Sequence, residues 1–178
     1  MSERIVIVDV GLGNLRSVAK AVETAGAGAS VELVRSSDPS VVRSADRLVV
    51  PGQGEFGNLA DRLEGGLGDA IRERLEKKTP YLGICLGLQI LFETSEEAPG
   101  KRGLGWFAGS VKRLVGGPSI KIPHMGWNQL EPQNGGHPLL PAGEWFYFVH
   151  SYHAVPDDPT VVRATCGYGD NRVTAAVG

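Results

Sequence analysis

Residues 80–92, PYLGICLGLQILF, are the stretch that decides the fold of this chain. A short apolar run enters the pattern Gly83-x-Cys85-x-Gly87, and a helix-like pattern follows at once. This is the layout of a nucleophile elbow, a sharp strand-to-helix turn, written here with cysteine in place of serine. Glycines on either side leave room for the turn and for close approach of a substrate. At a helix N-terminus, backbone N–H groups and the helix dipole favour a thiolate.

Cys85 therefore has two interpretations. It is the nucleophile of an α/β enzyme, or it is a small buried hydrophobic side chain in an apolar strand. Short glycine patterns occur in many proteins, so this motif by itself does not choose between the two.

The composition is that of a globular protein. The chain has 178 residues, of which 42% are hydrophobic and 21% charged, and both fractions are ordinary. Its net charge of −2 provides no electrostatic footprint for nucleic acid or an anionic membrane surface. We see no signal peptide and no run near the ~20 apolar residues that a membrane span needs. Two cysteines, Cys85 and Cys166, are too few for a disulfide framework or a zinc site. We therefore expect a cytoplasmic protein with reduced thiols, no metal and no cofactor.

The first half of the chain alternates strand-like and helix-like segments. The β-branched run at residues 5–8 is typical of a strand buried on both faces of a parallel sheet, and residues 31–34 and 48–50 predict two more strands. A helical pattern begins at residue 15, and a second one runs to residue 78 with an interruption by two glycines. The alternation predicts an α/β fold with a doubly wound open sheet.

Two glycine-rich turns follow predicted strands. They are residues 9–14, DVGLGN, and residues 51–57, PGQGEFG. Such turns present backbone N–H groups to an anion or a developing oxyanion, although a plain tight turn is the simpler explanation of the second. In doubly wound sheets, ligands bind outside the carboxyl ends of the strands. We therefore expect both turns and Cys85 to converge.

The second half predicts short strands separated by turns rich in proline and glycine. These strand-like runs are residues 110–115, 127–130, 145–149 and 161–166. We interpret them as an antiparallel extension of the parallel core or as a mixed sheet built onto it. No linker divides the chain, so we expect one domain over residues 1–178.

A catalytic thiol needs a base, which is usually a histidine. The chain has four, namely His124, His137, His150 and His153. Each could equally be a hydrogen-bonded structural or loop histidine. The pattern of residues does not single out one of them.

Several stretches together are similar to one known family. The elbow at residues 83–89 and the turn at 51–54 resemble the nucleophile motif and the oxyanion loop of class I, triad-type, glutamine amidotransferases. Further stretches resemble the glutaminase subunits of imidazole glycerol phosphate synthase within that class, and these are residues 9–15, 93–100, 123–128 and 147–152.

The resemblance implies a reaction. Cys85 would attack the carboxamide of glutamine, release ammonia and form a thioester that water hydrolyses to glutamate. A (β/α)8-barrel cyclase subunit would form a heterodimer with the chain. It would use the ammonia to convert phosphoribulosyl-formimino-AICAR phosphate (PRFAR) into imidazole glycerol phosphate and AICAR ribonucleotide.

The resemblance also implies roles for individual residues. Gly52 and the peptide N–H groups around Gln53 and Leu86 would stabilise the oxyanion. The glutamine pocket would contain Gly54, Gln89, Glu97, Ser151 and Tyr152. The residues facing the cyclase would be Asn14, His124 and Trp127.

The chain departs from the family pattern in one respect. The family's base and its orienting carboxylate lie in a His-Pro-Glu triplet near the C-terminus, and none of the four histidines here precedes Pro-Glu. We therefore expect the C-terminal end to be missing, either by truncation, which the apolar residues 173–177 favour, or in a natural variant. In both cases we expect negligible glutaminase activity. The alternatives are a non-catalytic protein of the same fold that docks on the cyclase, or another Cys-dependent α/β hydrolase.

Overall fold

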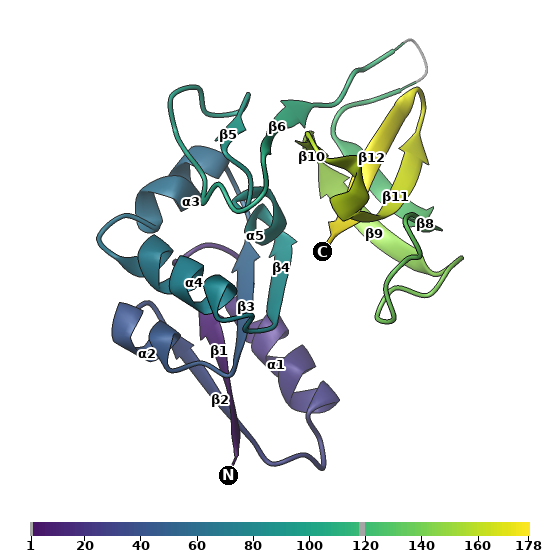
Figure 1. The fold of residues 1–178 in the computed structure, drawn as a ribbon. Helices are drawn as coiled ribbons and strands as arrows, with labels where there is room; N and C mark the ends of the chain where they lie inside the picture. The colour runs from purple at the N-terminus through teal and green to yellow at the C-terminus, as the bar shows by residue number, and fades with distance from the viewer. Residues whose placement is uncertain (1, 118–119) are drawn as a thin grey trace.

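The computed structural model describes residues 2–117 and 120–178 and shows two halves (Figure 1). The first half is a four-stranded parallel sheet in the order β2-β1-β3-β4. Its strands are β1 (Glu3–Val8), β2 (Val31–Ser36), β3 (Arg47–Gly52) and β4 (Tyr81–Cys85). The helices are α1 (Leu15–Ala25), α2 (Pro39–Arg43), α3 (Phe56–Arg62), α4 (Leu67–Glu76) and α5 (Leu86–Gln89).

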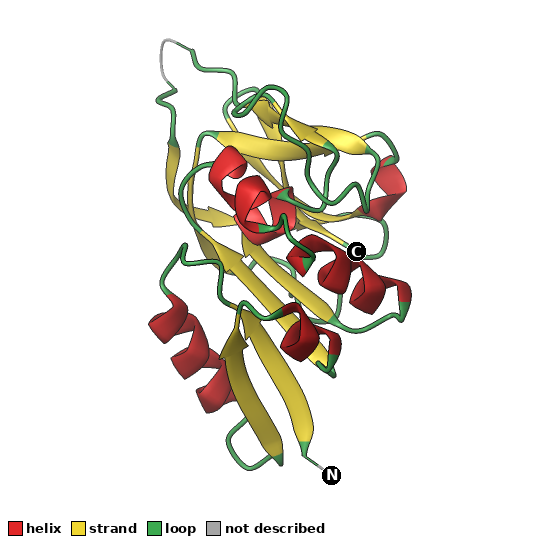
Figure 2. Ribbon diagram, turned by 90° about the vertical axis from the view of Figure 1, so that its left-hand side faces the viewer, coloured by secondary structure: helices red, strands yellow, loops and turns green. Residues whose placement is uncertain are grey.

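Helices cover both faces of this sheet (Figure 1, Figure 2). Alternate residues of a strand point to opposite faces, so β1 contributes Val6 and Val8 to one side and Ile7 to the other. Ile7 packs with Ala19 of α1. Val6 and Val8 pack with α3 and α4. The predicted doubly wound α/β fold is therefore confirmed.

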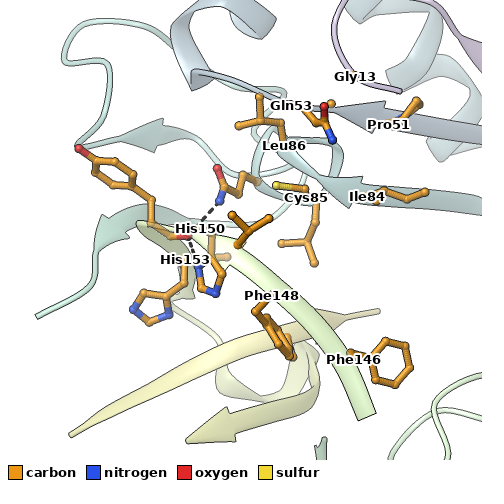
Figure 3. A pocket seen from close by; sticks show the side chains of 18 of the residues that line it. Gly13, Pro51, Gln53, Ile84, Cys85, Leu86, Phe146, Phe148, His150 and His153 are labelled. Atoms are coloured by element: carbon orange, nitrogen blue, oxygen red, sulfur yellow. Dashed lines mark hydrogen bonds between the residues drawn. The ribbon is translucent and has the colours of Figure 1, made fainter. Parts of the chain in front are cut away.

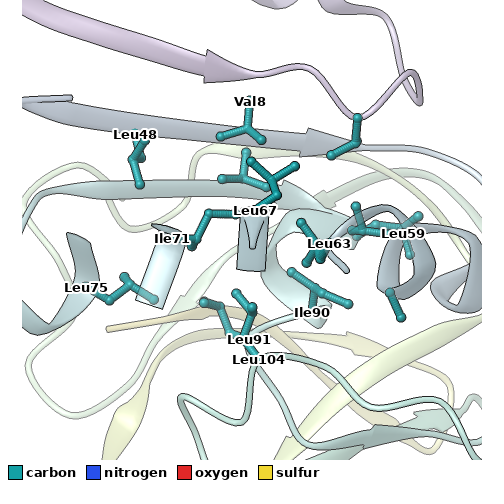
Figure 4. Close-up of a cluster of buried hydrophobic side chains, with 14 of the residues drawn as sticks. Val8, Leu48, Leu59, Leu63, Leu67, Ile71, Leu75, Ile90, Leu91 and Leu104 are labelled. Atoms are coloured by element: carbon teal, nitrogen blue, oxygen red, sulfur yellow. The ribbon is translucent and has the colours of Figure 1, made fainter. Parts of the chain in front are cut away.

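The larger core, on one side of the sheet, lies between the sheet and helices α3 and α4 (Figure 4). Its side chains are mainly leucines and valines that are buried almost completely, and each contributes roughly 1.5–3 kcal/mol by leaving water. Ile90 and Leu91, just after the elbow, belong to the same core. The packing of Ile90 and Leu91 in this core therefore fixes the position of the turn that carries Cys85.

The second half contains three small sheets, with strand orders β10-β6-β5, β12-β11-β8 and β7-β9. Within the described residues, none of these strands pairs with the parallel sheet, so the predicted antiparallel strands form separate sheets rather than one extension. Their bounds are β5 (Thr94–Ser95), β6 (Gly109–Arg113), β7 (His124–Gln129), β8 (Glu131–Pro132), β9 (Trp145–His150), β10 (Tyr152–Pro156), β11 (Val162–Tyr168) and β12 (Asn171–Val177).

The helix after Cys85 is shorter than the sequence pattern predicted. Helix α5 ends at Gln89, where the hydrogen bonds tighten, since Leu91 N–H donates to the Leu88 carbonyl at 3.2 Å and Phe92 N–H to the Gln89 carbonyl at 3.1 Å. Leu104 N–H donates to the Ile90 carbonyl at 2.7 Å, and Trp106 N–H donates to the Leu91 carbonyl at 2.8 Å. The apolar run 90–92 thus ends in a turn and not in a longer helix. None of the helices in the described ranges has the length and apolar character needed to cross a lipid bilayer.

Candidate active site

Cys85 lies at the junction of β4 and α5 with φ 57° and ψ −109°. A residue other than glycine with positive φ is uncommon, and such a conformation costs about 1–3 kcal/mol. The residue is exposed and its thiol is free, although the protein around the sulfur is dense enough to desolvate a thiolate. This is the strand-to-helix turn that the glycine pattern predicted.

The two glycines beside Cys85 are required by close backbone approach. A Cβ atom on Gly83 would overlap the carbonyl of Gly87, and a Cβ on Gly87 would overlap the carbonyl oxygen of Val50 in β3. The Tyr81 hydroxyl also donates a hydrogen bond to the Gly87 carbonyl at 2.6 Å. Burial raises the pKa of Tyr81, so its hydroxyl keeps its proton and remains a donor at neutral pH. The sequence analysis did not predict the hydrogen bond between Tyr81 and Gly87. A tyrosine in an aliphatic strand does indicate that its hydroxyl forms a hydrogen bond when it is buried.

The predicted oxyanion groups surround Cys85. Gly52 is the register partner of Cys85 across the β3–β4 ladder. A Cβ on Gly52 would lie 2.7 Å from the Leu86 side chain, so only glycine allows this approach. The first glycine-rich turn reaches the same place, since a Cβ on Gly13 would lie 3.7 Å from the Gln53 nitrogen. The two turns and the cysteine converge as the α/β topology predicted.

A cavity of about 840 Å³ opens in front of Cys85, between the parallel sheet and the β9–β10 segment (Figure 3). His150 and His153 lie on its wall. His124, His137 and Trp127 do not line it. The residues that the resemblance placed at the oxyanion site and the glutamine pocket all line this cavity, and they are Gly52, Gln53, Gly54, Leu86, Gln89, Glu97, Ser151 and Tyr152.

Gln89 carries a polar atom without a partner. Its side chain is 7% exposed, and its Nε2 donates to the Tyr152 carbonyl at 3.1 Å. Its Oε1 is buried and has no hydrogen-bond donor within the described residues. An unsatisfied buried acceptor costs about 1–3 kcal/mol, so a ligand with an N–H donor would be stabilised here.

Glu97 connects the cavity to helix α3. Its carboxylate accepts a hydrogen bond from Phe56 N–H at 2.8 Å, at the start of a helix whose N-cap residue Glu55 makes no side-chain cap. Burial raises the pKa of the Cys85 thiol, and the negative charge of Glu97 raises it further. A backbone hydrogen bond with Leu86 acts in the opposite direction.

No histidine forms a hydrogen bond with Cys85 in the part of the chain that the structure describes. His150 is engaged with the Tyr152 carbonyl and with His124. Because the pKa of the thiol is raised, Cys85 is mainly protonated at neutral pH.

The three residues expected to face a partner occupy different environments. Trp127 on β7 is 66% exposed. Asn14 accepts a hydrogen bond from Ser17 N–H at 3.1 Å and so caps α1 at the edge of the cavity. His124 is buried, with 2% of its surface exposed, contrary to the expectation that it faces a partner. Its ring stacks on Phe148 and Tyr168, because side chains alternate along β7 and His124 points inward.

Nearly the whole chain matches a single protein family. The model of glutamine amidotransferase class-I matches residues 6–175. The chain belongs to this family. Class-I glutamine amidotransferases are enzymes, and relatives of this chain are named imidazole glycerol phosphate synthase subunit HisH. The HisH of Thermosynechococcus vestitus is 48% identical over 177 residues, covering 97% of this chain and 82% of that relative. The HisH of Pyrococcus furiosus is 43% identical, covering 98% of this chain and 84% of that relative.

Solved structures have the same fold. One is a crystal structure of a glutamine amidotransferase, which superposes with a TM-score of 0.68 at 20% identity and covers 95% of this chain and 87% of the other. Another is a putative GMP synthase subunit from Thermoplasma acidophilum, with a TM-score of 0.62 at 21% identity, covering 96% of this chain and 80% of the other. The parallel core and the small antiparallel sheets are thus the architecture of class-I glutamine amidotransferases.

The strain at Cys85 leads to a stability prediction for this amidotransferase chain. We expect Cys85→Gly to have a free energy of unfolding about 1 kcal/mol higher than Cys85→Ala, because alanine at positive φ is strained and glycine is not. Urea unfolding monitored by circular dichroism measures the difference. Cys166 in β11 has no positive φ, so there we expect the glycine variant to be less stable than the alanine variant. An alanine variant at position 85 that is the more stable of the pair would contradict the prediction.

Proposed function

We propose that this chain is the glutaminase subunit of an imidazole glycerol phosphate synthase, acting as one amidotransferase domain over residues 1–178. In this role it hydrolyses glutamine to glutamate and ammonia through a thioester on Cys85. The observation that carries the proposal is that a strained cysteine, the Gly52–Gln53 turn, Leu86 and Gln89, whose Oε1 has no hydrogen-bond partner within the described residues, all line one cavity. Its two free cysteines fit a cytoplasmic location.

The chemistry follows from these positions. The Cys85 thiolate attacks the carboxamide carbon, and the oxygen that becomes negatively charged is stabilised by N–H groups of the Gly52–Gln53 turn and of Leu86. Collapse of this intermediate breaks the C–N bond, and the nitrogen leaves as ammonia with the proton that the Cys85 thiol gave up. Water then attacks the thioester and releases glutamate. Gln89 Oε1 accepts a hydrogen bond from an N–H of the bound glutamine, and Gly54, Glu97, Ser151 and Tyr152 enclose the substrate.

Alkylation of Cys85 tests this proposal. We expect a chloroketone analogue of glutamine to label Cys85, glutamine to protect it, and asparagine, which is one methylene shorter, to protect it poorly. Mass spectrometry of the peptides locates the label. Cys166 is a matched control within the chain, since it is fully buried and its pKa is raised to about 11. Labelling that glutamine does not slow would contradict a glutamine site.

An exposed face of β7 and β9, which borders the cavity because its Tyr147 and Val149 also line it, is the candidate docking surface for the proposed cyclase partner. This docking face consists of the cross-strand pairs Met125 with Val149 and Trp127 with Tyr147. All four side chains are more than half exposed, and the Trp127 and Tyr147 rings meet edge to face at 5.7 Å. Exposed apolar patches that contain tryptophan and tyrosine are typical of protein interfaces. We propose that the (β/α)8-barrel cyclase binds this face and receives the ammonia.

Replacing Trp127 should weaken the complex. We expect Trp127→Ala to raise the Kd for the cyclase about 30-fold or more, because truncation of a central interface tryptophan costs about 2 kcal/mol or more. Titration calorimetry with the purified cyclase subunit measures the change. Trp106→Ala is the matched control, since Trp106 is 41% exposed but lies outside β7 and β9. Equal effects of the two substitutions would exclude the docking face.

A second candidate is a non-catalytic protein of the same fold that docks on the cyclase. The raised pKa of Cys85 and the absence of a histidine hydrogen-bonded to it within the described ranges favour this alternative. It predicts a complex that makes imidazole glycerol phosphate from free ammonia but not from glutamine. The glutaminase proposal predicts glutamine-protected labelling of Cys85, so the two experiments separate the candidates.

A further inference from the structure

His150, Ser151 and Tyr152 form a corner between two sheets. His150 is the last residue of β9, which pairs with β7, and Tyr152 is the first residue of β10, which pairs with β6. The corner lies on the wall of the cavity opposite the elbow. Its backbone therefore contacts the elbow helix α5 through the Gln89 side chain.

The Tyr152 carbonyl at this corner accepts two hydrogen bonds (Figure 3). Gln89 Nε2 of α5 donates at 3.1 Å, and the second partner is His150 Nδ1 at 2.9 Å. A carbonyl oxygen has two lone pairs, so both contacts are satisfied together. Because a carbonyl is only an acceptor, His150 must carry its proton on Nδ1.

His124 completes the arrangement. In a neutral imidazole with its proton on Nδ1, Nε2 is an acceptor. His124 Nδ1 lies 3.0 Å from His150 Nε2 and must therefore be the donor. The His124 ring cannot easily turn, since it lies between Tyr168 and Phe148 with centroid distances of 4.0 and 4.9 Å. Its burial lowers its pKa to about 4, which leaves both rings neutral in the hydrogen-bond chain at pH 7.

The end of this hydrogen-bond chain is the Gln89 carboxamide. The Tyr152 carbonyl can only accept a hydrogen bond, so the Gln89 NH2 group points toward it and Oε1 points away from it. That oxygen is the buried acceptor without a partner. If the corner moved or the amide turned over, Gln89 would present a donor to the N–H of the substrate, and the two would repel.

We propose that His150, oriented by His124, is a positioning residue that sets the Tyr152 carbonyl and thereby the orientation of the Gln89 carboxamide toward the substrate. The inference rests on the proposed glutamine site. It assigns to the two histidines a role that is neither that of a base nor that of a partner contact.

Substitutions of His150 that keep or remove the Nδ1–H donor test the proposal in the full chain. We expect His150→Leu, which removes the donor, to raise the glutamine concentration that half-protects Cys85 from the chloroketone about tenfold. His150→Asn places an amide N–H near the position of Nδ1 and should restore protection to within about threefold of the wild type. His137→Leu is the matched control, because this histidine lies outside the cavity and should leave protection unchanged. Equal losses in the leucine and asparagine variants of His150, or no loss in either, would overturn the proposal.

A spectroscopic measurement of the histidine tautomers in the wild-type chain tests the proposal without a substitution that could impair folding and without bound glutamine. Long-range proton–nitrogen correlation spectra of the histidine rings should show His150 protonated on Nδ1. In His124→Phe, which keeps the ring stack, we expect His150 to shift toward the Nε2-protonated form and the Gln89 side-chain NH2 to exchange faster with water. A wild-type His150 protonated on Nε2 would overturn the proposal. Failure of glutamine to protect wild-type Cys85, with the Nδ1 tautomer present, would instead count against the proposed function alone.

Discussion

Gly87→Ala is expected to lower the free energy of unfolding by about 4 kcal/mol or more, and most of the protein should be recovered unfolded or aggregated. The added Cβ would overlap the Val50 carbonyl oxygen, which belongs to the backbone of the central strand β3. No flexible side chain can move aside, so either the strand or the elbow must shift. Both are fixed by the larger core, in which Val50 and Leu86 are buried.

Denaturant unfolding and the yield of soluble protein measure this effect. Gly167→Ala is the matched control, because a Cβ at Gly167 meets no atom within 4 Å. We expect the control to change the free energy of unfolding by less than about 1 kcal/mol. If Gly87→Ala were as stable as the control, the close packing of the elbow against β3 would be wrong.

The second large effect concerns catalysis. We expect the 178-residue chain, saturated with the cyclase, to release glutamate from glutamine at least ~10³-fold more slowly than the Pyrococcus furiosus HisH subunit under the same conditions. The described residues place no histidine in hydrogen-bond contact with Cys85, so no base draws the proton from the thiol. The raised pKa of Cys85 reduces the thiolate fraction further.

The pH dependence of the residual rate tests the cause. Only the thiolate attacks, and its fraction rises about tenfold per pH unit below the pKa of the thiol. Because burial raises this pKa above the usual value of 9.0, the rate should keep rising from pH 7 to pH 9 without a plateau. Cys85→Ser should abolish the residual rate. A plateau near pH 7, or glutamate release at the rate of the Pyrococcus relative, would show that a base acts on Cys85.

Local sequence was sufficient for the elbow and for the parallel half of the fold. The glycines at 83 and 87 are needed wherever a strand turns sharply into a helix against a neighbouring strand, so their spacing around Cys85 predicted the turn. The β-branched run in β1 and the apolar spacing of α1 predicted their elements for a similar reason. Side-chain periodicity and the sterics of the turn itself act between residues that are neighbours in the chain, whereas the close approach of Gly87 to Val50 forms only when β3 lies beside β4.

The resemblance to a family predicted site residues that local sequence patterns could not identify. The positions named for the oxyanion site and the glutamine pocket all line one cavity, although Gly52 and Tyr152 lie in different halves of the chain. Periodicity would not have selected Ser151 or Glu97. It also could not divide the antiparallel strands into three sheets, because short strands of similar composition can pair in several ways.

Tertiary packing alone decided the roles of the remaining polar groups. His124 follows a proline and precedes an exposed methionine, and nothing in these neighbours shows that it is buried between two aromatic rings. The orientation of Gln89 depends on a carbonyl that is 63 residues away in the chain. The strained backbone of Cys85 is a property of consecutive residues and can be predicted from them. The hydrogen bonds that aim side chains into its cavity join distant segments, so they exist only once those segments have packed together.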